Sequence, residues 1–181
     1  MLFRSAANHQ PLVAAGVHIS LKALIDDPSA TPEAKEYAAM ALCSLLKTAA
    51  NHQPLVAAGV HISLKELIDD PSATPEAKEY AAMALCSLSK TAANHQPLVA
   101  AGVHIALKAL IDDPSATPEA KKFAALALCY LSANSSNHQS LVAAGVHISL
   151  KALIDDPSAT AAAKKVAVVT LRTLGLSELV P

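Results

Sequence analysis

Apolar side chains recur at the spacing of an α-helix along residues 17–26. Val17, Leu21 and Leu24 follow one another at intervals of four and three residues, which places them on one face. The run ends at residues 26–28, where the sequence DDP stops a helix. The pattern therefore predicts a helix with one buried face that ends at this turn.

A second helical pattern begins a few residues later. Thr31 suits the N-cap position, Pro32 the first helical position and Glu33 the positive end of the helix. Small and apolar residues then recur at intervals of three and four, at Ala38, Ala41, Leu42 and Leu45. The alanines let neighbouring helices approach closely, so a tightly packed helix is expected here.

A shorter helix comes before these two. Asn8 can cap it, and Pro11 falls within its first turn, where a missing N–H does no harm. Gly16 supplies the left-handed residue that ends it. Apolar and polar residues do not alternate with period two, so strands are not expected. Three helices of unequal length are therefore predicted within residues 8–50.

The whole pattern returns every 43 residues. The stretch NHQPLVAAGVHI begins at residues 8, 51 and 94, and begins again at residue 137 with serine in place of its proline. A fixed period of this length is typical of stacked units that cannot bury their apolar faces alone. We therefore expect one all-α solenoid domain with three helices per repeat. Its four repeats span 8–50, 51–93, 94–136 and 137–181, after a partial helix turn at 1–7.

The motifs of one repeat resemble those of a known family. N-x-Q-x-L-V-x-A-G-V, followed by L-x-x-L-I and then by A-A-M-A-L-C-S-L, is similar to the armadillo repeat, whose third helix typically reads A-A-W-A-L-S-N-L. HEAT repeats are close relatives, but the short helix that ends at Ala15-Gly16 favours armadillo. The resemblance covers essentially the whole chain. It implies a right-handed α-α superhelix whose third helices line a concave face that binds extended peptides or protein surfaces.

The resemblance also points to a peptide clamp that this chain lacks. Members similar to karyopherin-alpha use a tryptophan and an asparagine four residues apart on the third helix. The residues at these positions here are Met40 and Ser44, Met83 and Ser87, Leu126 and Tyr130, and Val169 and Thr173. No repeat has the tryptophan–asparagine pair, so binding of nuclear-localisation signals is not inferred.

The third helices are still the candidate interaction surface. Along the repeats this face changes from polar to apolar, because Ser44 and Lys47 give way to Tyr130 and Ala133 in the third repeat. A protein or peptide partner is expected at the apolar end, and the alternative is a face that is only solvated. The candidate residues on this concave face are Glu36, Tyr37, Met40, Ser44, Tyr80, Met83, Ser87, Phe123, Leu126, Tyr130, Val169 and Thr173.

Both ends of the chain are apolar, whereas a solenoid usually ends in a repeat with a polar outer face. Residues 1–7 match the last turn of a third helix, so the first repeat is expected to lack most of its packing neighbour. Self-association through the terminal repeats would bury this surface, most commonly in a twofold homodimer. Truncation of a longer protein, or a designed fragment, is the alternative. The candidate self-association residues are Leu2, Phe3, Leu12, Val13, Val166, Val168, Leu176 and Leu179.

Composition narrows the classes of partner. The formal net charge is −1, and aromatic residues make up 3% with no tryptophan, so neither a basic face nor stacking platforms for nucleic acid are expected. No apolar run approaches the ~18 residues of a membrane helix, and the first ten residues do not form a secretory signal. We expect a cytoplasmic protein, in a reducing compartment, that binds neither nucleic acid nor membranes.

Histidine recurs twice in every repeat, at His9 and His18 and their equivalents. A zinc ion needs its ligands at about 2.0–2.1 Å, whereas equivalent residues on packed helices lie ~8–10 Å apart. A single pair within one repeat also falls short of three or four ligands. No metal site is therefore expected, and local hydrogen bonds at helix starts are the better interpretation.

Cysteines and paired aspartates also recur by repeat. Cys43, Cys86 and Cys129 occupy one repeat position, too far apart for the ~4.4–6.8 Å Cα separation of a disulfide, so buried thiols are expected. The pair Asp26-Asp27 always precedes Pro-Ser, which is a turn signature. No phosphate loop or nucleophile motif is present. Neither enzymatic activity nor a cofactor is expected.

Two functions are compatible with these features of the sequence. The first is an interaction module with a concave binding face, which the changed third helices of the last two repeats favour. The second is a structural or designed repeat protein, or a recently duplicated segment, with no selected ligand. The first two repeats differ only at Ala23 against Glu66 and at Leu46 against Ser89, and this near-identity favours the second function.

Overall fold

The computed structural model describes residues 5–180, in which twelve α-helices and no strands are found. The first repeat holds α1 (His9–Ala14), α2 (Val17–Asp26) and α3 (Pro32–Leu45), and the second holds α4 (His52–Ala57), α5 (Val60–Asp69) and α6 (Pro75–Ser89). The third holds α7 (His95–Ala100), α8 (Val103–Asp112) and α9 (Pro118–Ser132). The fourth holds α10 (His138–Ala143), α11 (Val146–Asp155) and α12 (Ala161–Thr173), followed by a 3-10 turn η6 (Ser177–Leu179). The predicted three helices per repeat are confirmed.

The helix boundaries follow the predicted signals. Gly16 joins α1 to α2 with a φ of 78°, a left-handed conformation that glycine adopts without strain. The Thr31 hydroxyl accepts a hydrogen bond from the Ala34 amide at 3.2 Å and caps α3, with Pro32 at its first position. The same glycine and threonine positions recur in each of the other repeats. The repeated stop and start signals therefore fix where the chain turns.

The asparagine that opens each repeat has a different role from the one predicted. A 3-10 turn precedes the first helix of each repeat, and the asparagine lies in it with helical φ and ψ and no side-chain cap bond. In the inner repeats its amide donates backwards instead, from Asn51 to the Leu45 carbonyl at 2.9 Å and from Asn94 to the Leu88 carbonyl at 3.0 Å. The predicted N-cap is therefore wrong. The carbonyls at the end of the preceding third helix otherwise accept only a long turn bond, such as that from the Thr48 amide to Leu45 at 3.3 Å, and they take the asparagine amide as a second donor.

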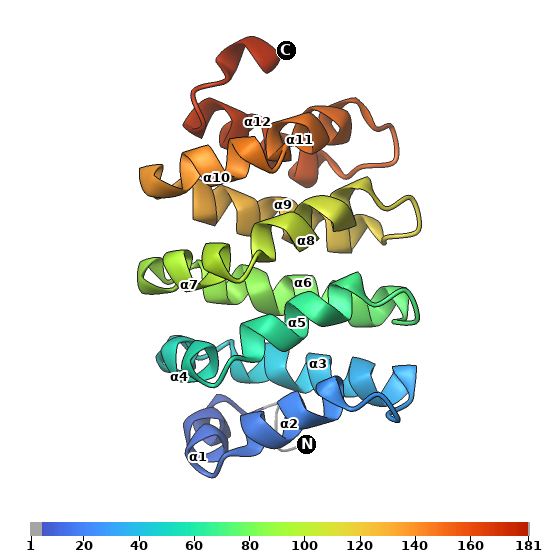
Figure 1. Cartoon of the computed structure of the whole chain (residues 1–181), viewed down its shortest axis with the longest axis vertical. Helices are drawn as coiled ribbons and strands as arrows, with labels where there is room; N and C mark the ends of the chain where they lie inside the picture. The colour runs from blue at the N-terminus through green and yellow to red at the C-terminus, as the bar shows by residue number, and fades with distance from the viewer. Residues whose placement is uncertain (1–4, 181) are drawn as a thin grey trace.

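The four repeats stack one after another along the long axis of the molecule (Figure 1). The third helices α3, α6, α9 and α12 pack on one another in order and form one layer. The second helices α2, α5, α8 and α11 form a second layer, and the short first helices lie along one side. This is the predicted all-α right-handed superhelix.

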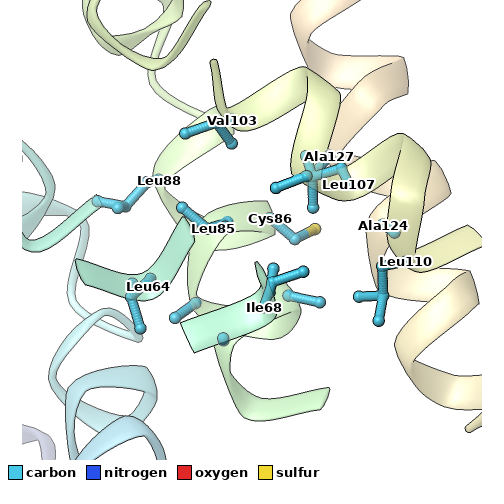
Figure 2. Packing of buried hydrophobic residues seen from close by; sticks show 14 of the residues in the cluster. Leu64, Ile68, Leu85, Cys86, Leu88, Val103, Leu107, Leu110, Ala124 and Ala127 are labelled. Carbon is cyan, nitrogen blue, oxygen red and sulfur yellow. The ribbon is translucent and has the colours of Figure 1, made fainter. Parts of the chain in front are cut away.

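One apolar interior runs through the stack. Alanines at the helix contacts, such as Ala81, Ala124 and Ala167, are fully buried and let the third helices pack closely. Figure 2 shows side chains of the second and third repeats, among them Cys86 and Leu107, in the same interior. Because this core belongs to pairs of repeats, each repeat depends on its neighbours for burial.

Candidate functional site

The solvent side of the third helices carries the predicted interaction residues, and we call it the third-helix face. Its most accessible side chains are Tyr37 (62% exposed), Val169 (44%) and Met40 (38%). Thr173 is exposed as well. The remaining candidates are half-buried, namely Glu36, Ser44, Tyr80, Met83, Ser87, Phe123, Leu126 and Tyr130. The structure thus brings these residues together on one row of helices.

Hydroxyl groups on this face are turned back onto their own helices. Ser44 Oγ donates to the Met40 carbonyl at 3.1 Å, and Thr173 Oγ1 donates to the Val169 carbonyl at 3.0 Å. Ser87 makes the same bond in α6. Because their protons are used within the helix, these side chains do not replace the asparagine amides of the family's peptide clamp. These hydroxyls are therefore engaged within their own helices.

A row of charged side chains crosses the third-helix face near the helix starts and changes sign along it. Glu36 Oε2 accepts a hydrogen bond from Thr74 at 2.8 Å, and Glu79 Oε2 accepts one from Thr117 at 2.6 Å. In the third repeat Lys122 stands at this position, where it pairs with Glu119 and lies 4.7 Å from the centre of the Phe123 ring. In the first two repeats this row is therefore acidic, and each of its carboxylates is hydrogen-bonded to a threonine of the next repeat.

Burial keeps other polar groups on these helices in their neutral forms. The pKa of Tyr80 is raised, first by burial and then by the nearby carboxylates of Glu36 and Glu79. Burial raises the pKa of the Cys43 and Cys86 thiols to about 11. A protonated thiol is a poor nucleophile, so these cysteines act as packing groups.

The recurring aspartates and the first histidine of each repeat make hydrogen bonds that hold the fold together. Asp27 accepts hydrogen bonds from the Ser29 amide at 2.8 Å and hydroxyl at 2.7 Å, which close the predicted turn and lower the pKa of the carboxyl. His52 contacts the Leu46 carbonyl oxygen at 2.9 Å and Thr91 at 2.8 Å, so it joins two repeats. Within residues 5–180, no three side chains of His, Cys, Asp or Glu lie close enough together to hold a metal ion.

The predicted self-association residues have mixed accessibility. Val13 belongs to the core at 9% exposed, because α1 packs against α2 and α3, so it offers little surface to another molecule. Leu12, Val166, Val168, Leu176 and Leu179 are half-buried, and Leu176 and Leu179 pack back against the core. Leu2 and Phe3 lie outside the described residues.

The structure shows one exposed group that was expected and one that was missed at the level of sequence. Leu24 is 37% exposed at the N-terminal end of the stack, as expected for the first repeat. A row of isoleucines on the second helices is also exposed, namely Ile19, Ile62, Ile105 and Ile148 at 57%, 44%, 54% and 65%. The isoleucine row could have been found from the helix periodicity, since position 19 falls outside the interval of the buried residues. Among the described residues, no helix has the length and apolar character to cross a membrane.

Comparisons with known proteins agree with this architecture. Neither the protein-family models nor the curated proteins provide a match. Among solved structures, a designed armadillo repeat protein in complex with the peptide (KR)4 matches 97% of this chain and 75% of its own length, with a TM-score of 0.83 and 26% identity. A second designed armadillo repeat protein matches 98% of this chain and 77% of its own length, with a TM-score of 0.84 and 27% identity.

An engineered protein at 18% identity has the same fold, with a TM-score of 0.83 over 97% of this chain and 76% of its own length. These likenesses agree with the features derived above: the 43-residue period, the left-handed glycine after each short helix and the layer of stacked third helices. The chain is an armadillo-like repeat protein.

Proposed function

We propose that the chain is a non-enzymatic scaffold that binds an extended peptide or a protein surface on its third-helix face. One observation carries the proposal. The third helices hold most of the differences between repeats, and changed positions such as Leu126, Tyr130 and Val169 lie on the accessible side of α9 and α12, although Ser132 and Thr170 are buried. The first and second helices, by contrast, are almost the same in all four repeats. A binding surface that selects one partner needs side chains that differ from repeat to repeat, and in this chain such side chains lie mainly on the third helices.

The peptide complex of the similar designed armadillo protein supports this class of function. That protein is in complex with a basic peptide, whereas the charged row on the third-helix face here carries carboxylates in its first half, at Glu36 and Glu79, and Lys122 in the third repeat. The second half presents Phe123, Leu126 and Tyr130 beside Lys122. We therefore expect a partner segment with apolar side chains at the end that lies on the last two repeats.

A displayed library of random peptides, selected on the intact chain, tests the proposal. Binding of a selected peptide should weaken by about tenfold or more in the Tyr130→Ala and Leu126→Ser variants, because these side chains would form the apolar contact. Ile105→Ser is the matched control, since Ile105 is 54% exposed on a second helix and away from this face. Failure to select any peptide, or equal loss in the control, would contradict the proposal.

A second candidate is a designed or duplicated repeat protein whose main property is folding and self-association through its ends. The first two repeats differ at two positions of 43, and the structural neighbours named above are designed or engineered. Light scattering on the intact chain separates the candidates. A dimer that persists in Tyr130→Ala, together with no selectable peptide, would favour this second function.

A further inference from the structure

A cleft opens between the ends of the third helices of the first and second repeats. Its volume is ≈ 400 Å³, and Lys47 lines it together with Ser87, Lys90 and Thr91. Lys47 and Lys90 are exposed, whereas His52, which also lines the cleft, is 4% exposed. Because Ser87 belongs to the third-helix face, the cleft lies at one edge of that face. We call it the lysine cleft.

The two lysines of this cleft have no counter-charge in the described chain. Lysines on the second helices pair with an aspartate one turn further on, as Lys65 does with Asp69 at 2.8 Å. Within residues 5–180, neither Lys47 nor Lys90 makes an ion pair with a carboxylate. Burial raises the pKa of the Cys43 thiol, and the charges of both lysines oppose that rise, so both ammonium groups act on the same point. The cleft therefore carries two positive charges that these residues do not neutralise.

The lysines are also not needed to end their helices. A lysine near a helix C-terminus often bonds to the last carbonyl groups. In α6, however, the Leu88 carbonyl accepts from the Asn94 amide at 3.0 Å, and the Ser89 carbonyl accepts from His95 Nε2 at 2.8 Å. The equivalent asparagine and histidine bond to the end of the preceding third helix in the same way. The ammonium groups therefore remain available to a ligand.

The hydroxyl groups of the cleft already donate elsewhere. Ser87 Oγ donates to the Met83 carbonyl at 3.1 Å. His52 Nε2 donates to the Leu46 carbonyl at 2.9 Å, which leaves Nδ1 of the neutral ring as an acceptor. The Thr91 hydroxyl, 2.8 Å from this Nδ1, donates to it. A ligand in the cleft is therefore held mainly by the N–H groups of the two lysines.

Nearby negative charge is too weak or too distant to cancel the two lysines. Each helix C-terminus carries about half a negative charge from its peptide dipoles, against a full positive charge on each lysine. Glu36 stands near the other end of α3, roughly 16 Å from Lys47 along the helix axis. Charges are screened within about 8 Å at physiological salt. The lysine cleft therefore attracts an anion.

The third repeat changes the residues that form this cleft. Tyr130 and Ala133 stand there at the positions of Ser87 and Lys90. Between the second and third repeats, one of the two lysines is thus missing and a larger side chain replaces the serine. The paired lysines therefore mark the polar end of the third-helix face, away from the apolar side chains of the last two repeats.

We infer that the lysine cleft binds the phosphoryl group of a phosphorylated serine or threonine in the peptide that the third-helix face takes up. A phosphomonoester has a charge of about −1.5 to −2 near pH 7 and three acceptor oxygens, which match two unpaired ammonium groups. Lysine binds phosphate as a point charge, whereas the planar fork of arginine is the better match for a carboxylate. The inference names the chemistry of the partner on the first two repeats, and to that extent it rests on the proposed function.

Phosphorus NMR of a short defined probe tests the inference. The probe is acetyl-glycyl-phosphoseryl-glycinamide, titrated with the intact chain at physiological salt. We expect a saturable change in its phosphorus resonance. Lys47→Ala and Lys90→Ala should each weaken binding of the probe by about tenfold or more, because each removes one of the two charges. Both lysines are exposed, and alanine is already present at the equivalent Ala133, so the variants are expected to fold.

Lys164→Ala is the matched control. It removes the same charge from a lysine of α12 that makes no ion pair in the described chain and does not line the cleft. This variant should leave the affinity for the probe unchanged. The probe has no apolar side chains, so its binding does not depend on the contacts proposed for Leu126 and Tyr130.

Four results would overturn the inference. The first is no saturable change in the phosphorus resonance, and the second is an unchanged affinity in Lys90→Ala. The third is equal displacement of the probe by acetyl-glycyl-glutamyl-glycinamide, which would assign the cleft to carboxylates. The fourth is tighter binding of inorganic phosphate than of the probe, which would assign the cleft to the free ion. Each of these results leaves the peptide selection described above unaffected, and failure of that selection leaves binding of the probe unaffected.

Discussion

The first and second repeats are nearly the same in sequence, yet they differ in how much of each is buried. Leu21 and Leu24 are partly open in the first repeat, and their equivalents Leu64 and Leu67 are 0% and 2% exposed in the second. The two substitutions between these repeats do not involve these leucines. The difference therefore comes from position in the stack, and it shows that the core of one repeat is completed by the repeat before it.

The largest expected effect comes from truncating the same leucine in both repeats. Leu67→Ala should lower the free energy of unfolding by about 2–5 kcal/mol, because it leaves a cavity in a closed core. Leu24→Ala should cost about 1 kcal/mol, since water already reaches that side chain. Urea denaturation followed by circular dichroism measures both losses. Equal losses would show that the surroundings of Leu24 are as closed as those of Leu67.

A smaller effect is expected at the asparagine that joins repeats. Asn94 is 2% exposed and its amide donates to the Leu88 carbonyl, which also accepts a longer bond from the Thr91 amide at 3.3 Å, so Asn94→Ala removes one of two buried hydrogen bonds. The expected loss is about 0.5–1.5 kcal/mol in the free energy of unfolding. Asn94→Asp should be at least as destabilising, because a carboxylate cannot donate this bond. If neither variant changes the urea midpoint by more than its experimental error, the Asn94 amide does not stabilise the junction between repeats.

Mild acid should weaken the stack. Burial lowers the pKa of His18, His61 and His104 from 6.5, so each is favoured in its neutral form when folded. Stability is therefore full above about pH 6.5 and is lost as the pH falls towards the folded-state pKa values. We expect a loss of order 1 kcal/mol, or about 2–4 °C in melting temperature, between pH 7.5 and pH 5.5.

The aspartates also have lowered pKa values, but their contribution is lost only at pH values near and below 3.8, outside this window. Replacing His61 and His104 by glutamine should flatten the profile between pH 7.5 and pH 5.5. An unchanged melting temperature across this range in the original chain would contradict the role given to the buried imidazoles.

The smallest effect belongs to the ion pairs between repeats. Lys78 Nζ lies 3.8 Å from Asp113 Oδ2, and both side chains remain partly exposed to water. Lys78→Met should cost no more than about 1 kcal/mol and should matter less at high salt. Lys164→Met is the control, because Lys164 makes no ion pair with another repeat in the described chain. If the two variants have equal melting temperatures at low salt, the ion pair between Lys78 and Asp113 does not contribute to stability.

Local signals in the sequence were sufficient for the fold. Gly16, Thr31 and Pro32 act within a few residues of their own position, so their roles could be predicted without the rest of the chain. The cap role predicted for Asn8 is wrong for this repeat position, because in the inner repeats its equivalents, such as Asn94, donate to a carbonyl of the preceding third helix, which the motif does not reveal. Periodicity identifies the helix face on which Leu24 lies, and the alignment of the repeats predicted that this face is less covered in the first repeat.

The candidate site was predictable only in part. The row of third-helix residues follows from the repeat and from the armadillo resemblance. The back-bonding of Ser44 and the ring contact of Lys122 depend on side-chain conformations, which spacing alone does not determine.

Hydrogen exchange resolved by repeat tests most directly whether each repeat is completed by its neighbour. Peptides of α2 and α5 differ in mass because one contains Ala23 and the other Glu66, so mass spectrometry can follow the two helices separately in the intact chain. The account predicts that α5 amides exchange about tenfold or more slowly than those of α2, since α5 lies between two repeats. Equal exchange in the two helices would contradict a stack in which neighbours supply the stability.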